Sequence, residues 1–251
     1  MGTVYMSVAN QKGGVGKTTF TSAFASFIHY QTKLNVLVVD ADFPQHSLLA
    51  NRQRDTERVN ADAYLKQLAI NQFRVMGKKA YPILKSTPET AIQVANTYLS
   101  KNNNFHIVLF DLPGTVQSDG VLFTLSSLDV VFIPLIADRI VLESSLAFAT
   151  TLDKTFRQNK NVRLKGIYLF WNQVDGREKS DLYSIYEGVV RELNLVLLKN
   201  HVIDTKRFRK EMISERKQIF RSTLFPSSRR FLRESNLEEL ILEITKIVLN
   251  E

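Results

Sequence analysis

One glycine-rich segment constrains the fold of this 251-residue chain more than any other feature: residues 10–19 are NQKGGVGKTT. The segment follows an apolar run, Val4–Val8, and leads into an apolar-periodic run, Thr18–Gln31, which predict a strand and a helix. Glycines let consecutive backbone N–H groups turn toward one anion, and the start of a helix adds its positive dipole end. Lys17 adds a positive charge, and Thr18 adds a hydroxyl that can bind Mg²⁺. This order predicts a phosphate-binding loop; the alternative is a glycine-rich turn whose lysines have no role.

The segment departs from the general P-loop pattern at Gln11, where that pattern has glycine, and it contains a second lysine, Lys12. In this form it resembles the deviant Walker A motif, K-G-G-x-G-K-T-T, of the ParA/MinD family of dimeric ATPases. The resemblance implies that ATP and Mg²⁺ bind here, and that Lys12 crosses a dimer interface to reach the nucleotide of the other subunit. The loop residues that it assigns to the nucleotide are Gly13, Gly14, Val15, Gly16, Lys17, Thr18 and Thr19.

Short apolar runs alternate with helical patterns along the chain, which is typical of a parallel sheet with crossover helices. We expect one α/β domain over residues 1–251, with a mostly parallel central sheet covered by helices on both faces. The resemblance implies the three-layer, Rossmann-like P-loop NTPase fold. The predicted strands are Val4–Val8, Val36–Val39, Phe105–Phe110, Val130–Pro134 and Lys165–Phe170, and the predicted helices are Thr18–Gln31, Pro88–Ser100, Ile140–Arg157 and Leu182–Leu193.

Three further segments give local predictions. Pro88 and Glu89 suit the first turn of their helix, after a cap in the Ser86–Thr87 region. The polar segment Ala50–Lys79 has no strong pattern, and we expect it at the edge of the sheet. Residues 236–249 have one apolar stripe at helical spacing and a Glu-rich opposite face, which predicts a closing helix packed on the sheet.

Three aspartates stand where predicted strands end: Asp40 and Asp42 after the second strand, and Asp111 after the third. Ligands bind at this edge of open α/β sheets, and an ionised acid there is costly without a cation or donors nearby. A lone aspartate at such a position is also a helix N-cap. The resemblance implies that Asp111 is the Walker B aspartate, which reaches Mg²⁺ through water, and that Asp40 and Asp42 form a D-x-D element. It thus predicts Thr18, Asp40 and Asp111 at the metal, and Lys12, Lys17 and Asp42 in catalysis, with Asp42 positioning the water.

The residues WNQVD follow the fifth predicted strand, from Trp171 to Asp175. The resemblance implies that Asn172 contacts adenine. An Asn-x-x-Asp string is also similar to the guanine-reading motif of GTPases, but that motif has lysine where this chain has Gln173, so we expect ATP. An Asx-turn that ends the strand is the alternative. Residues 42–47, 171–178 and 220–226 are, more narrowly, similar to TraA-type ParA proteins on conjugative transposons of Bacteroidetes.

The net charge of +8 comes from one segment. Residues 199–233 contain eleven basic and three acidic residues, and the rest of the chain is balanced. Such a block indicates a polyanionic partner, nucleic acid or acidic lipid, whereas a solvated Arg-rich helix and loop is the alternative. The residues that we expect to contact DNA, without sequence preference, are Lys206, Arg207, Arg209, Lys210, Arg229, Arg230 and Arg233.

Composition excludes several classes of protein. The chain has no cysteine, which excludes thiol catalysis, Cys-ligated zinc, iron–sulfur clusters and disulfides, and fits a reducing compartment. The N-terminus lacks the layout of a signal peptide. The longest apolar run, Val130–Ala137, has eight residues, whereas a membrane span needs about 20. We therefore expect a cytoplasmic protein that does not bind membranes.

The functional prediction is a ParA-type ATPase that dimerises with ATP, binds non-specific DNA and acts in partition, maintenance or conjugative transfer of a plasmid or mobile element. A ParB-like or transfer-system protein would stimulate its slow hydrolysis of ATP. A MinD-like membrane positioner is one alternative, but acidic lipid would repel a Glu-rich last helix. An ATP-dependent ligase of the dethiobiotin synthetase type is the other, and it would leave the basic segment without a role.

Overall fold

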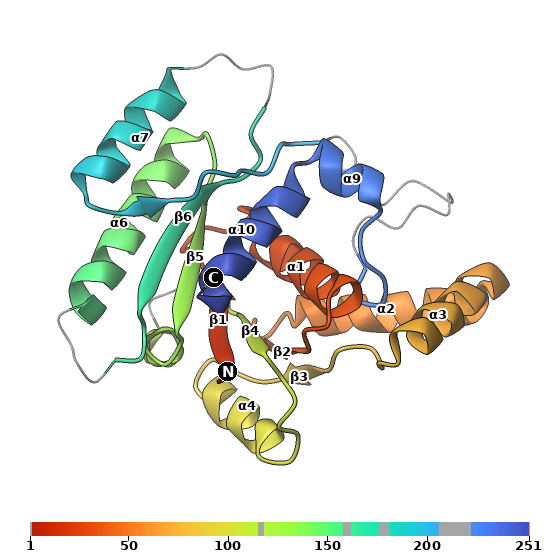
Figure 1. Ribbon diagram of the computed structural model, residues 1–251. Helices are drawn as coiled ribbons and strands as arrows, with labels where there is room; N and C mark the ends of the chain where they lie inside the picture. The colour runs from red at the N-terminus through yellow and green to blue at the C-terminus, as the bar shows by residue number, and fades with distance from the viewer. Residues whose placement is uncertain (1, 115–117, 158–161, 176–180, 206–221, 251) are drawn as a thin grey trace.

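The computed structural model describes residues 2–114, 118–157, 162–175, 181–205 and 222–250 (Figure 1). Within these ranges seven strands form one parallel sheet in the order β3-β2-β4-β1-β5-β6-β7. The strands are β1 (Val4–Val8), β2 (Val36–Asp40), β3 (Ile83–Lys85), β4 (Ile107–Asp111), β5 (Val130–Leu135), β6 (Gly166–Trp171) and β7 (Val196–Leu197). The helices are α1 (Lys17–Gln31), α2 (Ser47–Ala61), α3 (Ala63–Met76), α4 (Ala91–Leu99), α5 (Asp119–Ser126), α6 (Arg139–Arg157), α7 (Leu182–Glu192), α9 (Arg229–Glu234) and α10 (Leu237–Leu249). The predicted α/β fold with a parallel sheet is confirmed.

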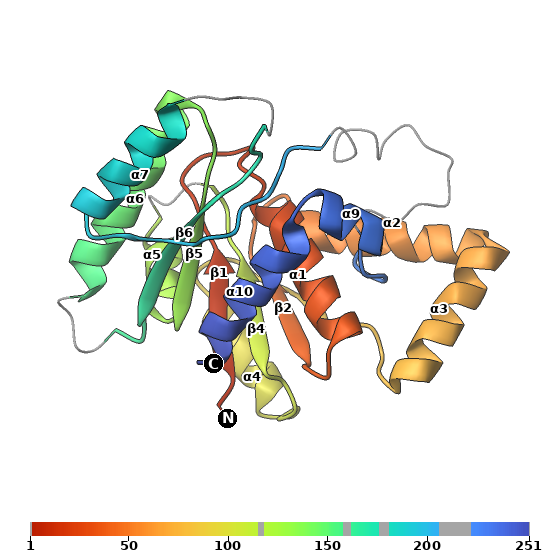
Figure 2. The same ribbon diagram turned by 45° about the horizontal axis from the view of Figure 1, so that its top comes forward.

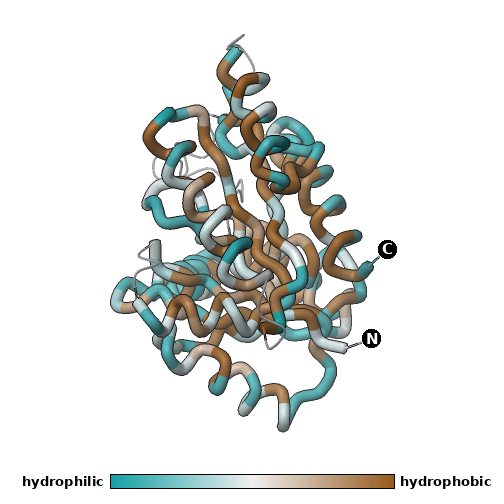
Figure 3. The backbone as a smooth tube through the Cα atoms, turned by 90° about the vertical axis from the view of Figure 1, so that its left-hand side faces the viewer, coloured by the Kyte–Doolittle hydropathy of each residue, from teal (hydrophilic) through white to brown (hydrophobic). Residues whose placement is uncertain are grey.

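Helices cover both faces of the sheet (Figures 1 and 2). Consecutive strand residues pack against opposite faces. In β2, Val36 and Val38 join the core under α1 and α10, whereas Leu37 and Val39 join the core under α4 and α5. Because both faces are covered, these strands are apolar throughout instead of alternating. Figure 3 shows the apolar strands running through the middle of the molecule.

The strand order reverses around β1, which lies between β4 and β5. One part of the chain continues from β1 toward β2 and β3, and a later part continues from β5 toward β7. The connections therefore diverge at the carboxyl end of β1, and such a switch point leaves a crevice above the sheet. The glycine-rich loop leaves β1 at this place.

The last described helix, α10, packs on the same face as α1. Its buried side chains recur at helical spacing, and its polar residues, among them Glu239 and Lys246, lie on the solvent side. The buried set is Leu237, Leu240, Ile241, Ile244 and Val248.

The segment Ala50–Lys79, which we expected at the edge of the sheet, mostly forms the two helices α2 and α3, and neither helix was predicted. In α2 only Leu48 and Asp55 are buried, so no apolar period marks the helix in the sequence. A polar signal does mark the start of α3, where the side chain of Asp62 accepts hydrogen bonds from the backbone N–H groups of Tyr64 and Leu65.

The prediction that Pro88 and Glu89 open a helix is wrong. Residues 88–90 form a turn, in which the N–H of Thr90 donates to the carbonyl of Thr87 at 3.2 Å, and the helix begins at Ala91. The hydroxyls of Ser86 and Thr90 lie 3.0 Å apart, and such local bonds compete with the helix. The short elements β3, β7 and α5 were not predicted either.

Candidate functional site

The loop between β1 and α1 is fixed from its first residue. The side-chain amide of Asn10 donates to the carbonyl of Pro134 and to the hydroxyl of Ser145, both at 2.8 Å, and its Oδ1 accepts from the N–H of Lys12 at 3.0 Å. Gly14 and Gly16 have φ values of +75° and +88°, in the left-handed region that glycine tolerates best. The N-cap residue of α1 is Gly16, which has no side chain to cap the helix. The first N–H groups of α1 are thus available to an anion.

The carboxyl end of β6 supports the same loop. The side-chain amide of Asn172 donates to the carbonyl of Val15 at 2.8 Å, and that of Gln173 donates to the carbonyl of Gly14 at 3.1 Å. A Cβ atom on Gly16 would lie only 2.7 Å from Nδ2 of Asn172. The close approach of loop and strand therefore requires glycine at position 16.

Lys17 lies at the start of α1 and bends back over the loop. Its Nζ donates to the carbonyl of Lys12 at 3.0 Å and lies beside Gly114, where a Cβ atom would be 3.1 Å away. Burial lowers the pKa of Lys17, and the negative charges of Asp111 and Asp42 oppose that shift. The ammonium group of Lys17 is thus surrounded by backbone groups and acids. In such a buried site its attraction to an anion is stronger than it would be in water.

Thr18, the residue after Lys17, contacts Asp111. The hydroxyl of Thr18 donates to Oδ2 of Asp111 at 2.9 Å, and Oδ1 of this fully buried carboxyl has no hydrogen-bond partner among the described residues. Burial raises the pKa of Asp111 to about 7; the hydrogen bond from Thr18 opposes the shift, and the charges of Asp40 and Asp42 add to it. A buried carboxyl with one unpaired oxygen beside a hydroxyl is an arrangement that a hard cation would stabilise.

Asp40 pairs in register with Asp111 across β2 and β4, but its two oxygens have other partners. Oδ1 accepts from the N–H of Asp42 at 3.3 Å, and Oδ2 accepts from the N–H of Leu49 at 2.9 Å. The ring Nδ1 of His46 lies 3.7 Å from Oδ1. Asp40 thus holds the loop between β2 and α2 and does not line the cavity; its predicted contact with the metal stays a prediction that this geometry does not favour.

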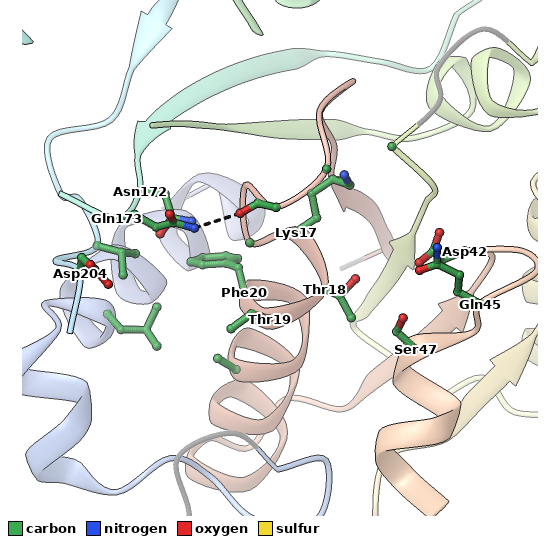
Figure 4. Close-up of a pocket in the computed structure, with 17 residues that line it drawn as sticks. Lys17, Thr18, Thr19, Phe20, Asp42, Gln45, Ser47, Asn172, Gln173 and Asp204 are labelled. Atoms are coloured by element: carbon green, nitrogen blue, oxygen red, sulfur yellow. Dashed lines mark hydrogen bonds between the residues drawn. The ribbon is translucent and has the colours of Figure 1, made fainter. Parts of the chain in front are cut away.

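A cavity of about 470 Å³, within the usual size range of small-molecule sites, is lined by residues of the loop together with Lys17 and Thr18. Figure 4 shows Asn172, Gln173 and Asp204 at one end, Asp42, Gln45 and Ser47 at the other, and Lys17 and Thr18 between them. The structure thus brings Asp42 and Asn172 to one cavity with the loop. The other lining residues are Gly13, Gly14, Gly16, Thr19, Phe20, Ala23, Gly114, Val202 and Leu237.

Some of these lining residues were not predicted. Gln45 and Ser47 lie three and five residues after Asp42, so their closeness to that acid in the sequence was an available signal. The apolar residues Phe20, Val202 and Leu237 come from three separate parts of the chain and have no local signal. Lys12, in contrast, was predicted, and its half-buried side chain does not line the cavity of its own chain.

The predicted DNA contacts are only partly described. Lys206, Arg207, Arg209 and Lys210 lie outside the described residues. Arg229, Arg230 and Arg233 lie exposed on α9, whose Phe231 and Leu232 are buried in the core. Nε of Arg230 contacts Oε1 of Glu234 at 2.7 Å, an exposed pair of little energetic weight. Across the described ranges, no helix has both the length and the apolar character needed to cross a membrane.

Comparisons with known proteins show what this chain is similar to. The chain is 28% identical over 180 residues to the chromosome-partitioning ATPase Soj of Thermus thermophilus, which covers 68% of this chain and 70% of the relative. A plasmid partition protein from Borrelia burgdorferi superposes with a TM-score of 0.60 at 16% identity, covering 98% of each chain. Cobyrinic acid a,c-diamide synthase from Mycobacterium smegmatis, solved with a bound ATP analog and magnesium, gives 0.59 at 18% identity and covers 90% of this chain and 99% of its own.

At these identities the likeness to the solved structures shows the fold alone. The family model of the CobQ/CobB/MinD/ParA nucleotide binding domain, however, matches residues 6–219, which is most of the sequence. This chain belongs to the CobQ/CobB/MinD/ParA family of nucleotide-binding domains.

Proposed function

We propose that the protein is a ParA-type ATPase that dimerises with ATP, binds DNA without sequence preference, and acts in the cytoplasm in partition, maintenance or conjugative transfer of a plasmid or mobile element. The observation that supports this most is that Lys17 and Thr18 at the start of α1 line one cavity with Asp42, while Asp111 is hydrogen-bonded to Thr18. The relative named as a chromosome-partitioning ATPase supports the cellular role.

The cavity offers groups suited to the phosphates of ATP and others suited to its base. The uncapped N–H groups of α1 and the ammonium of Lys17 favour the phosphates. Phe20, Val202 and Leu237 line the same cavity and offer apolar surface to a base. The N–H₂ of Asn172 is used on the loop, so its Oδ1 is the atom that would accept a hydrogen bond from the amino group of adenine.

Mg²⁺ fits the oxygen donors beside the phosphate position. Thr18 Oγ1 and the unpaired Oδ1 of Asp111 are the protein atoms that would hold it, directly or through water. Among the described residues no group of three or more acidic or histidine side chains could hold a metal ion by itself. Mg²⁺ in nucleotide sites is usually bound by one or two carboxylates together with the phosphates. When bound, it would neutralise charge on the phosphate oxygens.

Asp42 is the acid placed to position the attacking water. It lines the cavity at the end opposite Asn172, whereas Asp40 is fully buried behind it and fixes its loop through the N–H of Asp42. A single carboxylate gives weak activation of water, which suits slow hydrolysis that a ParB-like or transfer-system protein stimulates. Lys12 is free of its own cavity and would complete that of the second subunit.

The apolar stripe of α10 bears on the membrane alternative. A membrane-binding helix must present its apolar face to lipid, but the α10 stripe from Leu237 to Val248 is packed on the sheet. This burial favours DNA over lipid as the polyanion.

The test is ATP-dependent binding to a non-specific DNA duplex at two salt concentrations, with ADP and Lys17→Ala as controls and anionic liposomes as the competing surface. We expect ATP to strengthen DNA binding, salt to weaken it steeply, and liposomes to bind neither form. DNA binding that is the same with ATP and ADP, or an ATP-dependent association with liposomes alone, would contradict the proposal. A ligase would turn over ATP only with a small substrate and would ignore DNA.

A further inference from the structure

A buried carboxylate on α2 holds the segment that precedes α9. Oδ2 of Asp55, which is 8% exposed, accepts hydrogen bonds from the N–H of Thr223 at 2.7 Å, the hydroxyl of Thr223 at 2.9 Å and the hydroxyl of Ser222 at 3.1 Å. Hydrogen bonds to an ionised acceptor are about twice as strong as neutral ones. Asp55 therefore fixes the backbone of Thr223 and the side chains of Ser222 and Thr223.

Arg52, one turn earlier on α2, holds the same segment. Its Nε donates to the hydroxyl of Thr223 at 2.9 Å, and its Nη2 donates to the carbonyls of Thr223 and Tyr81, both at 3.0 Å. The guanidinium also lies 4.8 Å from the centre of the Tyr81 ring. These bonds use the planar fork of arginine, which lysine lacks.

Helix α1 reaches the segment from the other side. The hydroxyl of Ser26 donates to the carbonyl of Ser222 at 2.6 Å, and the hydroxyl of Tyr30 donates to the carbonyl of Thr223 at 2.8 Å. The 222–225 segment is thus hydrogen-bonded to α1 and α2 at once, and both views show it beside these helices (Figures 1 and 2). Its position depends on how the two helices lie relative to each other.

Apolar contacts with α3 also hold the 222–225 segment. Leu224 and Phe225 are buried against Ala69, with Phe73 partly buried beside them. The side-chain amide of Gln72 donates to the carbonyl of Leu224 at 2.8 Å. The segment is therefore enclosed by helices and cannot shift without moving against them.

The same two helices begin at the cavity. Helix α1 starts with Lys17 and Thr18, and α2 starts at Ser47, which lines the cavity. Along each helix the contact with the segment lies eight residues further on, at Ser26 and Asp55, or about 12 Å. On its other side the segment leads to α9, with Arg229, Arg230 and Arg233 exposed. The network therefore joins the two helices that start at the cavity to the segment that precedes the described basic cluster.

We propose that Asp55, together with Arg52, is a positioning residue that couples nucleotide binding to DNA binding. This inference rests on the proposed function. A nucleotide that draws the start of α2 toward the start of α1 changes their relative position, the 222–225 segment follows, and α9 moves with it. For stability alone a well-packed apolar cluster would serve as well as a buried charged network, so the charged network points to a role beyond packing.

The first measurement needs no DNA. Hydrogen exchange of residues 222–225 is compared with ADP and with a non-hydrolysable ATP analog, in the wild type and in Asp55→Asn. Asparagine keeps the size of the side chain but removes its charge. We expect the nucleotide to change exchange in the wild-type segment and not in the variant. If wild-type exchange in this segment is the same with both nucleotides, the coupling proposal is wrong whatever the protein does with DNA.

The second measurement is the ratio of the DNA dissociation constants with ADP and with the ATP analog. We expect Asp55→Asn to lower this ratio roughly 2- to 30-fold. The affinity for the analog and the DNA affinity with ADP should stay at the wild-type values. Glu57→Gln is the matched control, because it removes the same charge from the exposed face of the same helix.

Two variants separate coupling from folding. Arg52→Lys keeps the positive charge but loses the planar guanidinium, so it should lower the ratio of DNA dissociation constants even if Asp55→Asn does not fold. Thr223→Ser keeps the N–H and the hydroxyl that Asp55 binds, so it should preserve this ratio. A lower melting temperature with an unchanged ratio in Arg52→Lys would show that the network is only structural. If the wild type shows nucleotide-dependent exchange at 222–225 but no nucleotide-dependent DNA binding, the proposed function fails and the coupling within the chain stands.

Discussion

The hydroxyl of Thr18 donates a hydrogen bond of 2.9 Å to Oδ2 of Asp111, and this bond joins the first turn of α1 to the carboxyl end of β4. It satisfies only one oxygen of a carboxyl that is fully buried. Because the ionised form of Asp111 lacks solvent and a full set of donors, its pKa rises to about 7. Without a metal, the folded protein therefore retains a proton on Asp111 at pH values where the unfolded chain has lost it.

This difference predicts a pH dependence of stability. Between 3.8, the ordinary pKa of an aspartate in an unfolded chain, and the folded value of about 7, the folded state binds one proton more. The free energy of unfolding therefore falls as pH rises through this window and levels off above it. The full effect is about 4 kcal/mol. Asp111→Asn removes the titrating group, so its stability relative to the wild type should increase between pH 5 and pH 8. Urea denaturation of both proteins in EDTA measures this, and parallel pH profiles would contradict it.

Lys17→Ala should abolish nucleotide binding, because the phosphates lose the lysine that the cavity presents to them. One charged hydrogen bond contributes about 1.5–3 kcal/mol, so the affinity should fall by at least about 10- to 100-fold. Calorimetry measures the affinity directly, and the buried Trp171, the chain's only tryptophan and the neighbour of Asn172, offers a fluorescence signal. Lys33→Ala, on the exposed turn after α1, is the control. Near-normal ATP affinity in Lys17→Ala would refute the P-loop assignment.

Lys12→Ala should bind ATP as a monomer and fail to dimerise. The reason is geometric: Lys12 does not line its own cavity, although its carbonyl holds Nζ of Lys17. Removing the side chain leaves that backbone bond in place. Light scattering with ATP and with ADP measures the oligomeric state, and an intact ATP-dependent dimer of the variant would remove the argument for a lysine that acts in trans.

Asp42→Ala should bind ATP and dimerise but hydrolyse it far more slowly, since Asp42 contacts the cavity without being part of the phosphate loop. Asp40→Asn should behave differently. It weakens two hydrogen bonds to backbone N–H groups inside the protein, so we expect a loss of about 1–3 kcal/mol in stability. Steady-state hydrolysis and thermal melts separate the two effects. Loss of ATP binding in Asp42→Ala, with binding kept in Asp40→Asn, would mean that the two roles are exchanged.

The sequence predicts the parts of this fold whose signals are local. Buried parallel strands are short apolar runs, and the loop motif lies between β1 and α1, so five strands and the phosphate loop could be placed. Helix α2 could not be predicted, because it buries only Leu48 and Asp55 and is held by polar contacts with other elements. The hydrogen bond from the N–H of Thr223 to Asp55 joins residues 168 positions apart, and no local pattern indicates such a pair.

The residues of the candidate site also differ in whether a local sequence signal predicts their position. Asp42 and Asp111 were predicted because one follows a strand and the other ends a strand, at the same edge of the sheet. The sequence did not predict that Asp40 lies outside the cavity. Its position depends on a hydrogen bond from the N–H of Leu49, which the first turn of α2 brings close to the end of β2. Likewise Leu237 reaches the cavity only because α10 packs beside α1.

The last prediction concerns the basic residues. If the segment 199–233 binds DNA, replacing Arg229, Arg230 and Arg233 on α9 by glutamine should weaken ATP-dependent DNA binding equally for all sequences. Each lost phosphate contact should reduce the magnitude of the log–log salt slope by about one. Because these side chains are exposed, the fold and the ATPase activity without DNA should be unaffected.

A second variant tests Lys206, Arg207, Arg209 and Lys210 as a cluster. A cluster whose charges face the nucleotide or the Glu-rich side of α10 would leave DNA binding unchanged when it is neutralised. The charge-matched control for the three-residue α9 variant replaces Lys101, Lys154 and Arg191, which are exposed and belong to segments that cover the other face of the sheet. DNA binding that keeps its strength and salt slope after both clusters are neutralised would identify the charge excess as a solvated surface. The polyanion would then have to bind elsewhere on the dimer, and the role of Asp55 in positioning α9 would lose its purpose.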